Sequence, residues 1–92
     1  MDRKQVEKKV KAVVAEVFGV KAGKLKDSTS FVDDLHAKSM DIVELLAALE
    51  MEFGFRVPQR DVRQNKSIKA AVDYMYKKAK KSGSKKHHGK GV

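Results

Sequence analysis

The sequence predicts an all-α fold, a four-helix bundle with a long loop between its first and second helices and a short third helix. Apolar residues recur at helical spacing in three separate segments, with glycine and proline between them. No segment alternates apolar and polar residues as a strand would. With 92 residues and no cysteine, the chain has room for a single core and forms no disulfide.

The first helix is expected near residues 3–18. Its apolar residues share one face, at Val6, Val10, Val13, Val14, Val17 and Phe18. Gly19 ends the pattern, and a mostly polar loop follows as far as about Lys38. Loops of this length are often functional. We expect the apolar residues of this loop to hold it across the bundle, namely Leu25, Phe31, Val32 and Leu35.

The second helix is expected over about Ser39 to Phe53, before Gly54. Its core stripe consists of Ile42, Leu45, Leu46, Leu49 and Phe53. A second apolar stripe lies on another face and consists of Met40, Val43, Ala47 and Met51. Such a helix is either deeply buried or presents a docking face.

Pro58 favours a turn into a brief third helix near residues 59–64, and Ser67 can cap the last helix. The core residues of that helix are Ile68, Ala71, Val72 and Met75. From about Lys77 the apolar period fades. We therefore expect a folded domain over residues 1–78 and a basic, disordered tail over 79–92.

The net charge of +9 is concentrated at the C-terminal end. Residues 77–92 hold seven lysines and no acid, which leaves a net charge of +2 on residues 1–76. The tail is interpreted as a solubilising extension, with weak contact to an anionic surface as an alternative. The start of the chain lacks the apolar stretch of a secretory signal, and the longest apolar run is Leu45 to Leu49, so a soluble, cytoplasmic protein is expected.

Ser39 stands where the loop meets the most apolar helix. Serine there can simply cap the helix, because its oxygen satisfies a backbone donor. The same place also suits a phosphodiester, since a helix N-terminus offers free N–H groups and a positive dipole end. Position alone does not decide between these two interpretations.

The surrounding segment does favour one of them. Residues 31–50 read FVDDLHAKSMDIVELLAALE and resemble the signature of acyl carrier proteins, in which F-x-x-D-L precedes D-S-L and D-x-V-E-L follows. The resemblance continues through EFGFRVP at 52–58 and IKAAVDY at 68–74, and covers about residues 3–78. It implies an acyl-carrier-like four-helix bundle.

The resemblance also implies a carrier function and no enzymatic activity of its own. Ser39 would receive a covalent 4'-phosphopantetheine arm from coenzyme A, through a phosphopantetheinyl transferase. The thiol of the arm would hold acyl groups as thioesters, sheltered in the bundle, and pass them between acyl-loading and acyl-transfer enzymes of lipid or fatty-acid biosynthesis. The expected partner-docking residues are Met40, Asp41, Val43, Glu44, Ala47, Glu50, Met51, Arg60 and Arg63.

The chain departs from the family pattern at three places. Lys38 stands where the family usually has Asp before the serine, which puts modification by a standard transferase in doubt. His36 stands where Gly is common, so the backbone there lacks the freedom of Gly at positive φ. The third helix, normally acidic, carries Arg60 and Arg63. These departures predict a specialised carrier.

Two other functions stay open at this stage. The cargo could be an aminoacyl or peptidyl group, or the protein could be a helical non-carrier whose basic tail binds anions. Aromatic and basic residues are not interleaved, so no specific nucleic-acid partner is expected. His87 and His88 without a third ligand make a poor metal site, so no metal is expected. We expect a monomer.

Overall fold

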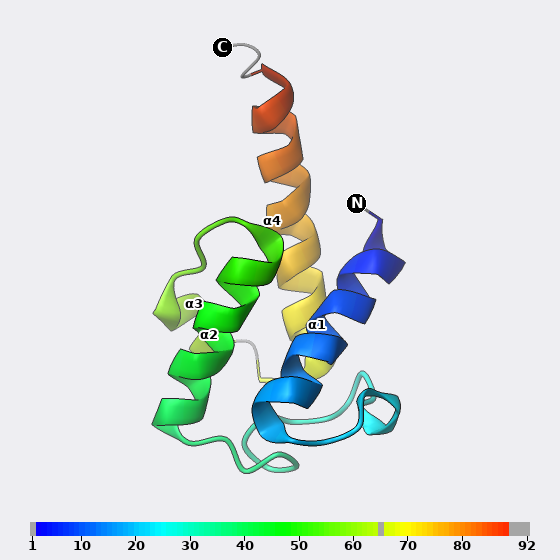
Figure 1. The fold of residues 1–92 in the computed structure, drawn as a ribbon, viewed down its shortest axis with the longest axis vertical. Coiled ribbons are helices and arrows are strands. Elements are labelled where there is room, and N and C mark those ends of the chain that lie inside the picture. Colours follow the sequence, from blue (N-terminus) through cyan, green and yellow to red (C-terminus); the bar gives the residue numbers. More distant parts are fainter. Residues whose placement is uncertain (1, 65, 89–92) are drawn as a thin grey trace.

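The protein folds into an all-helical bundle. The computed structural model describes residues 2–64 and 66–88, with the backbone alone described for residues 62, 63 and 82–88. These residues form the helices α1 (Arg3–Phe18), α2 (Ser39–Phe53), α3 (Gln59–Gln64) and α4 (Ile68–His88), and the 3₁₀ helix η1 (Ala22–Lys24). α1 packs against both α2 and α4, and the short α3 lies beside α2 (Figure 1). The all-α prediction and the predicted helix starts are confirmed.

The core lies where the apolar stripes of α1, α2 and α4 meet. It contains thirteen buried residues: Val6, Val10, Val13, Val14, Leu25, Phe31, Leu45, Leu49, Val57, Ile68, Ala71, Val72 and Met75. In α1, α2 and α4, the spacing of the buried residues puts them on one side of the helix. A helical conformation therefore lets them be buried together. Phe53 and Leu46, also expected in the core, pack at its edge.

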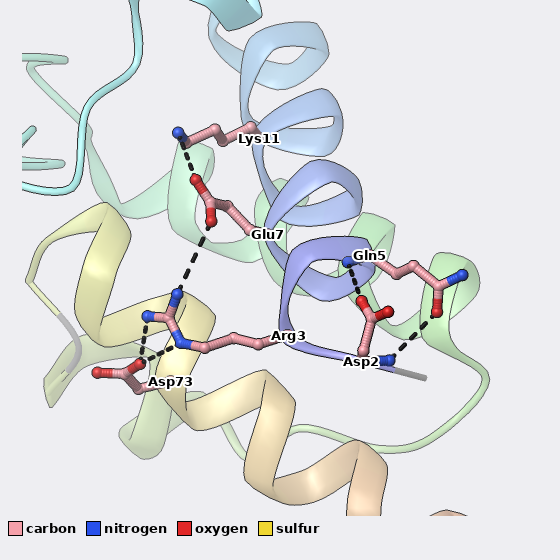
Figure 2. Close-up of polar contacts among 6 residues, drawn as sticks. All are labelled: Asp2, Arg3, Gln5, Glu7, Lys11 and Asp73. Atoms are coloured by element: carbon pink, nitrogen blue, oxygen red, sulfur yellow. Dashed lines mark hydrogen bonds and ion pairs between the residues drawn. The ribbon is translucent and has the colours of Figure 1, made fainter.

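The start of α1 is fixed by a capping box, shown in Figure 2. The Asp2 carboxylate accepts a hydrogen bond from the backbone N–H of Gln5 at 2.9 Å. The Gln5 side chain accepts in return from the backbone N–H of Asp2 at 3.2 Å. The pair satisfies two of the backbone donors that a helix start leaves without partners.

A chain of charged groups ties α1 to α4 (Figure 2). The Arg3 guanidinium donates two hydrogen bonds to the Asp73 carboxylate on α4. On the other side it lies 3.7 Å from Glu7, which also accepts a hydrogen bond from Lys11 at 2.8 Å. The hydrogen bond from Lys11 is the main reason that the pKa of Glu7 lies below its usual value.

The long loop is attached to the bundle at two buried side chains and at the start of α4. Leu25 and Phe31 are buried in the core, as expected. The backbone N–H of Phe31 donates to the Lys66 carbonyl at 3.1 Å, and that of Ile68 donates to the Thr29 carbonyl at 2.9 Å. Val32 is exposed instead, so the expectation that it helps to hold the loop was wrong.

The last helix is longer than the sequence pattern predicts. We expected it to end near Lys77, with disorder beyond, but α4 continues to His88. Lysine and alanine both favour helices, and no proline interrupts them, so the helix can continue after its buried face has ended. Lys78 and Lys80 lie over the rings of tyrosines within the same helix. The rest of the predicted tail, 89–92, lies outside the described residues, and the domain boundary at 78 stays a prediction.

Candidate functional site

Ser39 is the first residue of α2 and is exposed. The loop before it is held by backbone hydrogen bonds, among them one of 2.8 Å from the N–H of Ala37 to the Phe31 carbonyl. Because Phe31 is buried, this bond connects the segment that presents Ser39 to the core. Ser39 does not cap α2, since the capping position belongs to Lys38.

The start of α2 lacks a side-chain cap. A lysine ammonium has no acceptor, so Lys38 makes no hydrogen bond to the first turn. Asp41 acts in the other direction: its carboxylate accepts from the backbone N–H of Lys38 at 2.9 Å. The N–H groups at the start of α2 therefore remain available to an anion, beside the positive charge of Lys38.

His36, which stands where Gly is common in the family, has an unusual backbone conformation. Its φ is 54°. Among the residues that the structure describes, every other residue with a positive φ is a glycine. Side chains with a Cβ adopt this left-handed conformation at a cost, although His does so more often than most residues. The turn that presents Ser39 is therefore formed without the glycine that would fit it best.

The second apolar stripe of α2 faces away from the core. Met40, Val43 and Met51 are 79%, 49% and 85% exposed, and Ala47 is exposed as well. Of the two interpretations of this stripe, deep burial is wrong. Single exposed apolar residues need no explanation, but a row of them along one helix makes this face a candidate surface for a partner.

The charged candidates differ in their surroundings. Glu44 is exposed on α2, and Arg60 is 88% exposed on its side chain, 3.9 Å from Asp61. Glu50 already has a structural partner, because its carboxylate accepts from the backbone N–H of Val57 at 2.8 Å. The side chain of Arg63 lies outside the described residues. The docking role of these residues stays a prediction.

A small apolar cavity lies inside the bundle. It measures about 10 Å³, room for roughly one water molecule, and its walls come from α2, α4, the long loop and the link before α3. The lining residues are Phe31, Leu45, Leu49, Val57, Ala71, Tyr74 and Met75. Tyr74 also donates a hydrogen bond through its hydroxyl to the Asp61 carboxylate on α3, at 2.6 Å.

Sequence reasoning missed the pairing of Tyr74 with Asp61. Tyr74 follows Ala71 by three residues, so it could have been placed on the edge of the apolar stripe of α4. Nothing in the spacing of the sequence points to Asp61, which comes from a separate helix.

Other kinds of site find no support in the part of the chain that the structure describes. No three His, Cys, Asp or Glu side chains there are grouped as metal ligands would be. Among the same residues, no helix is both long enough and apolar enough to cross a membrane.

Comparison with known proteins gives one family. A family described as "Phosphopantetheine attachment site" matches residues 8–75. The acyl carrier protein of Buchnera aphidicola subsp. Schizaphis graminum is 38% identical over 76 residues, which cover 83% of this chain and 96% of that protein. The solved structure of the acyl carrier protein from Enterococcus faecalis matches with a TM-score of 0.69 and 32% identity, over 84% of this chain and 98% of that one. The chain therefore belongs to the acyl carrier protein family, and its cofactor is a covalently attached 4'-phosphopantetheine.

Proposed function

We propose that Ser39 carries the phosphopantetheine arm. The observation that supports this most directly is its position: an exposed hydroxyl on the first residue of α2, beside N–H groups that no side chain caps. A phosphodiester on Ser39 would place its negative charge at the positive end of the helix dipole, next to the Lys38 ammonium. The residues present therefore fit the group.

The arm supplies a thiol that holds the acyl group as a thioester. The chain has no cysteine, so this thiol is the one available for the purpose. The protein's own residues present the arm and dock partners. We propose that the protein is a carrier and a substrate of other enzymes, that it catalyses no reaction itself, and that it works as a monomer in the cytoplasm.

The exposed apolar stripe of α2 is the proposed docking surface. Met40 and Met51 stand at its two ends, and Glu44 adds a negative charge on the same helix. Methionine suits a surface that meets several partners, because its flexible side chain adapts to different shapes. The proposed partners are a phosphopantetheinyl transferase and the enzymes that load and transfer acyl groups in lipid or fatty-acid synthesis.

Intact mass spectrometry tests the assignment of Ser39. The protein is incubated with coenzyme A and a transferase of broad specificity, and one phosphopantetheine should be added. Ser39→Ala should abolish the addition. Ser28→Ala, which alters another exposed serine of the loop before α2, is the matched control and should react like the wild type. Lack of modification of the wild type, under conditions that convert a control carrier, would contradict the proposal.

The same measurement on protein purified from its native host identifies the cargo. An acyl chain on the arm would agree with the proposed function. An aminoacyl or peptidyl group would instead support the alternative cargo.

A further inference from the structure

The cavity in the bundle is too small for the cargo that the proposed function assigns to the protein. At about 10 Å³ it has room for roughly one water molecule, whereas an acyl chain needs space for many carbon atoms. Protein interiors are closely packed and do not simply stretch. If the chain shelters its cargo here, one wall of the cavity has to move. This inference therefore rests on the proposed carrier function.

The wall formed by α2 and α4 is backed by α1 and is the hardest one to open. Val6, Val10 and Val14 on α1 are completely buried, and Leu45 of α2 and Val72 of α4 are buried beside them. Separating these helices would expose this apolar surface to water. The free-energy cost grows with the exposed area, so this side of the bundle is expected to stay closed.

Another wall is the link after α2, which leads directly into α3. Val57 in this link is buried and lines the cavity. None of the α3 side chains that the structure describes is buried. Instead, hydrogen bonds to side chains hold the wall: Glu50 accepts from the backbone of Val57, and Tyr74 donates to Asp61. Moving this wall would expose Val57 and break polar contacts that water can replace, so it would expose less buried apolar surface than separating α1 would.

Tyr74 connects the cavity to that wall. Its ring lines the cavity, and its hydroxyl donates to the Asp61 carboxylate of α3 at 2.6 Å. Hydrogen bonds to a charged acceptor are short and strong. Burial, followed by the hydrogen bond to Asp61, raises the pKa of Tyr74 to about 12, so the hydroxyl stays a donor at neutral pH.

We propose that the Tyr74–Asp61 hydrogen bond is the latch that closes the acyl cavity, and that Tyr74 thereby limits which chain lengths the protein shelters. With the latch closed, the Tyr74 ring forms part of the wall and the hydrogen bond links α3 to α4. When the bond breaks, α3 and the link can move away together and the ring can turn aside. The cargo stabilises this open form because it binds there and not in the closed form.

Tyr74→Phe tests the hydrogen bond separately from the cavity wall, because it removes the hydroxyl and keeps the ring. Tyr76→Phe is the matched control, since it removes a hydroxyl two residues along the same helix. Asp61→Asn keeps an acceptor but removes its charge, so its effect should be intermediate. A chain-length series from butyryl to dodecanoyl is attached to the arm of each variant.

Two measurements report on the latch. In the protein without cargo, the backbone amides of α3 should exchange with solvent about tenfold faster in Tyr74→Phe than in the wild type, as expected for the loss of one such hydrogen bond. The increase in Tm on acylation should be larger in Tyr74→Phe and should continue to longer chains. Opening costs less in this variant, so more of the binding free energy of the cargo appears as stability.

The outcomes separate this inference from the function on which it rests. If Tyr74→Phe matches the wild type in both α3 exchange and acyl-dependent Tm, the latch is overturned although the carrier function stands. A similar change in Tyr76→Phe would also overturn it, because the effect would then not depend on the hydrogen bond between Tyr74 and Asp61. Mass spectrometry of the same samples reports the arm, and a chain that accepts none would overturn both proposals.

Discussion

Replacing Lys38 is the most direct test of how the start of α2 is built. Lys38 occupies the capping position but offers no acceptor to the first turn. An acceptor at this position typically stabilises a protein by about 0.5–2 kcal/mol relative to a residue without one. Removing a positive charge from the N-terminal end of a helix adds about 0.3–1 kcal/mol. Lys38→Asn should therefore raise the free energy of unfolding by about 1–2 kcal/mol.

Three variants separate the two contributions. Lys38→Ala removes the charge without adding an acceptor, so it should gain only the smaller, salt-dependent part. Lys38→Asn gains both parts. Lys38→Asp adds a favourable negative charge at the helix end but places it near the Asp41 carboxylate, which already accepts from the backbone of residue 38. Its gain over Lys38→Asn should therefore be small.

Urea unfolding followed by far-UV circular dichroism measures these differences on protein without the arm. For a domain of this size, a gain of 1 kcal/mol corresponds to an increase in Tm of about 4–8 °C. The reasoning is refuted if Lys38→Asn unfolds at the same urea concentration as Lys38→Ala. An acceptor at this position would then contribute nothing, and the N–H groups of α2 would not be the open donors that the structure shows.

The remaining predictions concern four other features. His36→Gly should stabilise the protein by up to about 1 kcal/mol in thermal unfolding, because glycine adopts a positive φ without strain; an unchanged or lower Tm would contradict this. Deleting residues 77–92 should change the unfolding free energy by less than about 1 kcal/mol, because no α4 side chain that the structure describes is buried beyond Met75. A deletion that unfolds the chain would show that the domain boundary is misplaced. The raised pKa of Tyr74 means that the fold favours the neutral hydroxyl, so its stabilising contribution is present below pH 10.0 and disappears as the pH approaches about 12. The difference in stability between wild type and Tyr74→Phe should therefore shrink over that range, and a constant difference would argue against the bond to Asp61. Reversing Arg60 and Arg63 to Glu should speed turnover by fatty-acid enzymes adapted to acidic carriers, most clearly at low salt; equal rates would make this helix a solvated face without a role in recognition.

Much of the fold could be predicted from the sequence, because residues that are buried on one side of a helix recur at helical spacing along the chain. The bounds of α2, Ser39 to Phe53, follow from its apolar stripe and from Gly54, which has the positive φ of a helix end. The end of α4 could not be predicted in this way. Tyr76 packs at the edge of the core, and none of the α4 side chains that the structure describes beyond it is buried. The length of this part of the helix depends on helix propensity, which leaves no apolar period.

The site was predictable to a different degree. Ser39 could be proposed as the attachment site because its neighbours along the chain form a recognisable motif. The lack of a cap depends on a shift of one residue, since the capping position of α2 falls at Lys38 and not at Ser39. Sequence patterns rarely locate a helix boundary that closely. The Tyr74–Asp61 hydrogen bond joins two helices across the bundle, and only the folded chain brings these side chains together.

The two departures from local rules both lie within three residues of Ser39. Lys38 leaves the start of α2 uncapped, and His36 adopts a positive φ without being glycine. By contrast, α1 begins with a capping box, and α1 and α2 both end at glycines with a positive φ. Proteins tend to retain such local costs where function requires them. Here Lys38 leaves the first turn of α2 without a side-chain cap, so this turn should open more readily than the rest of the helix. Once a phosphodiester is attached, its charge would supply what the first turn lacks, so modification and the stability of this turn are coupled.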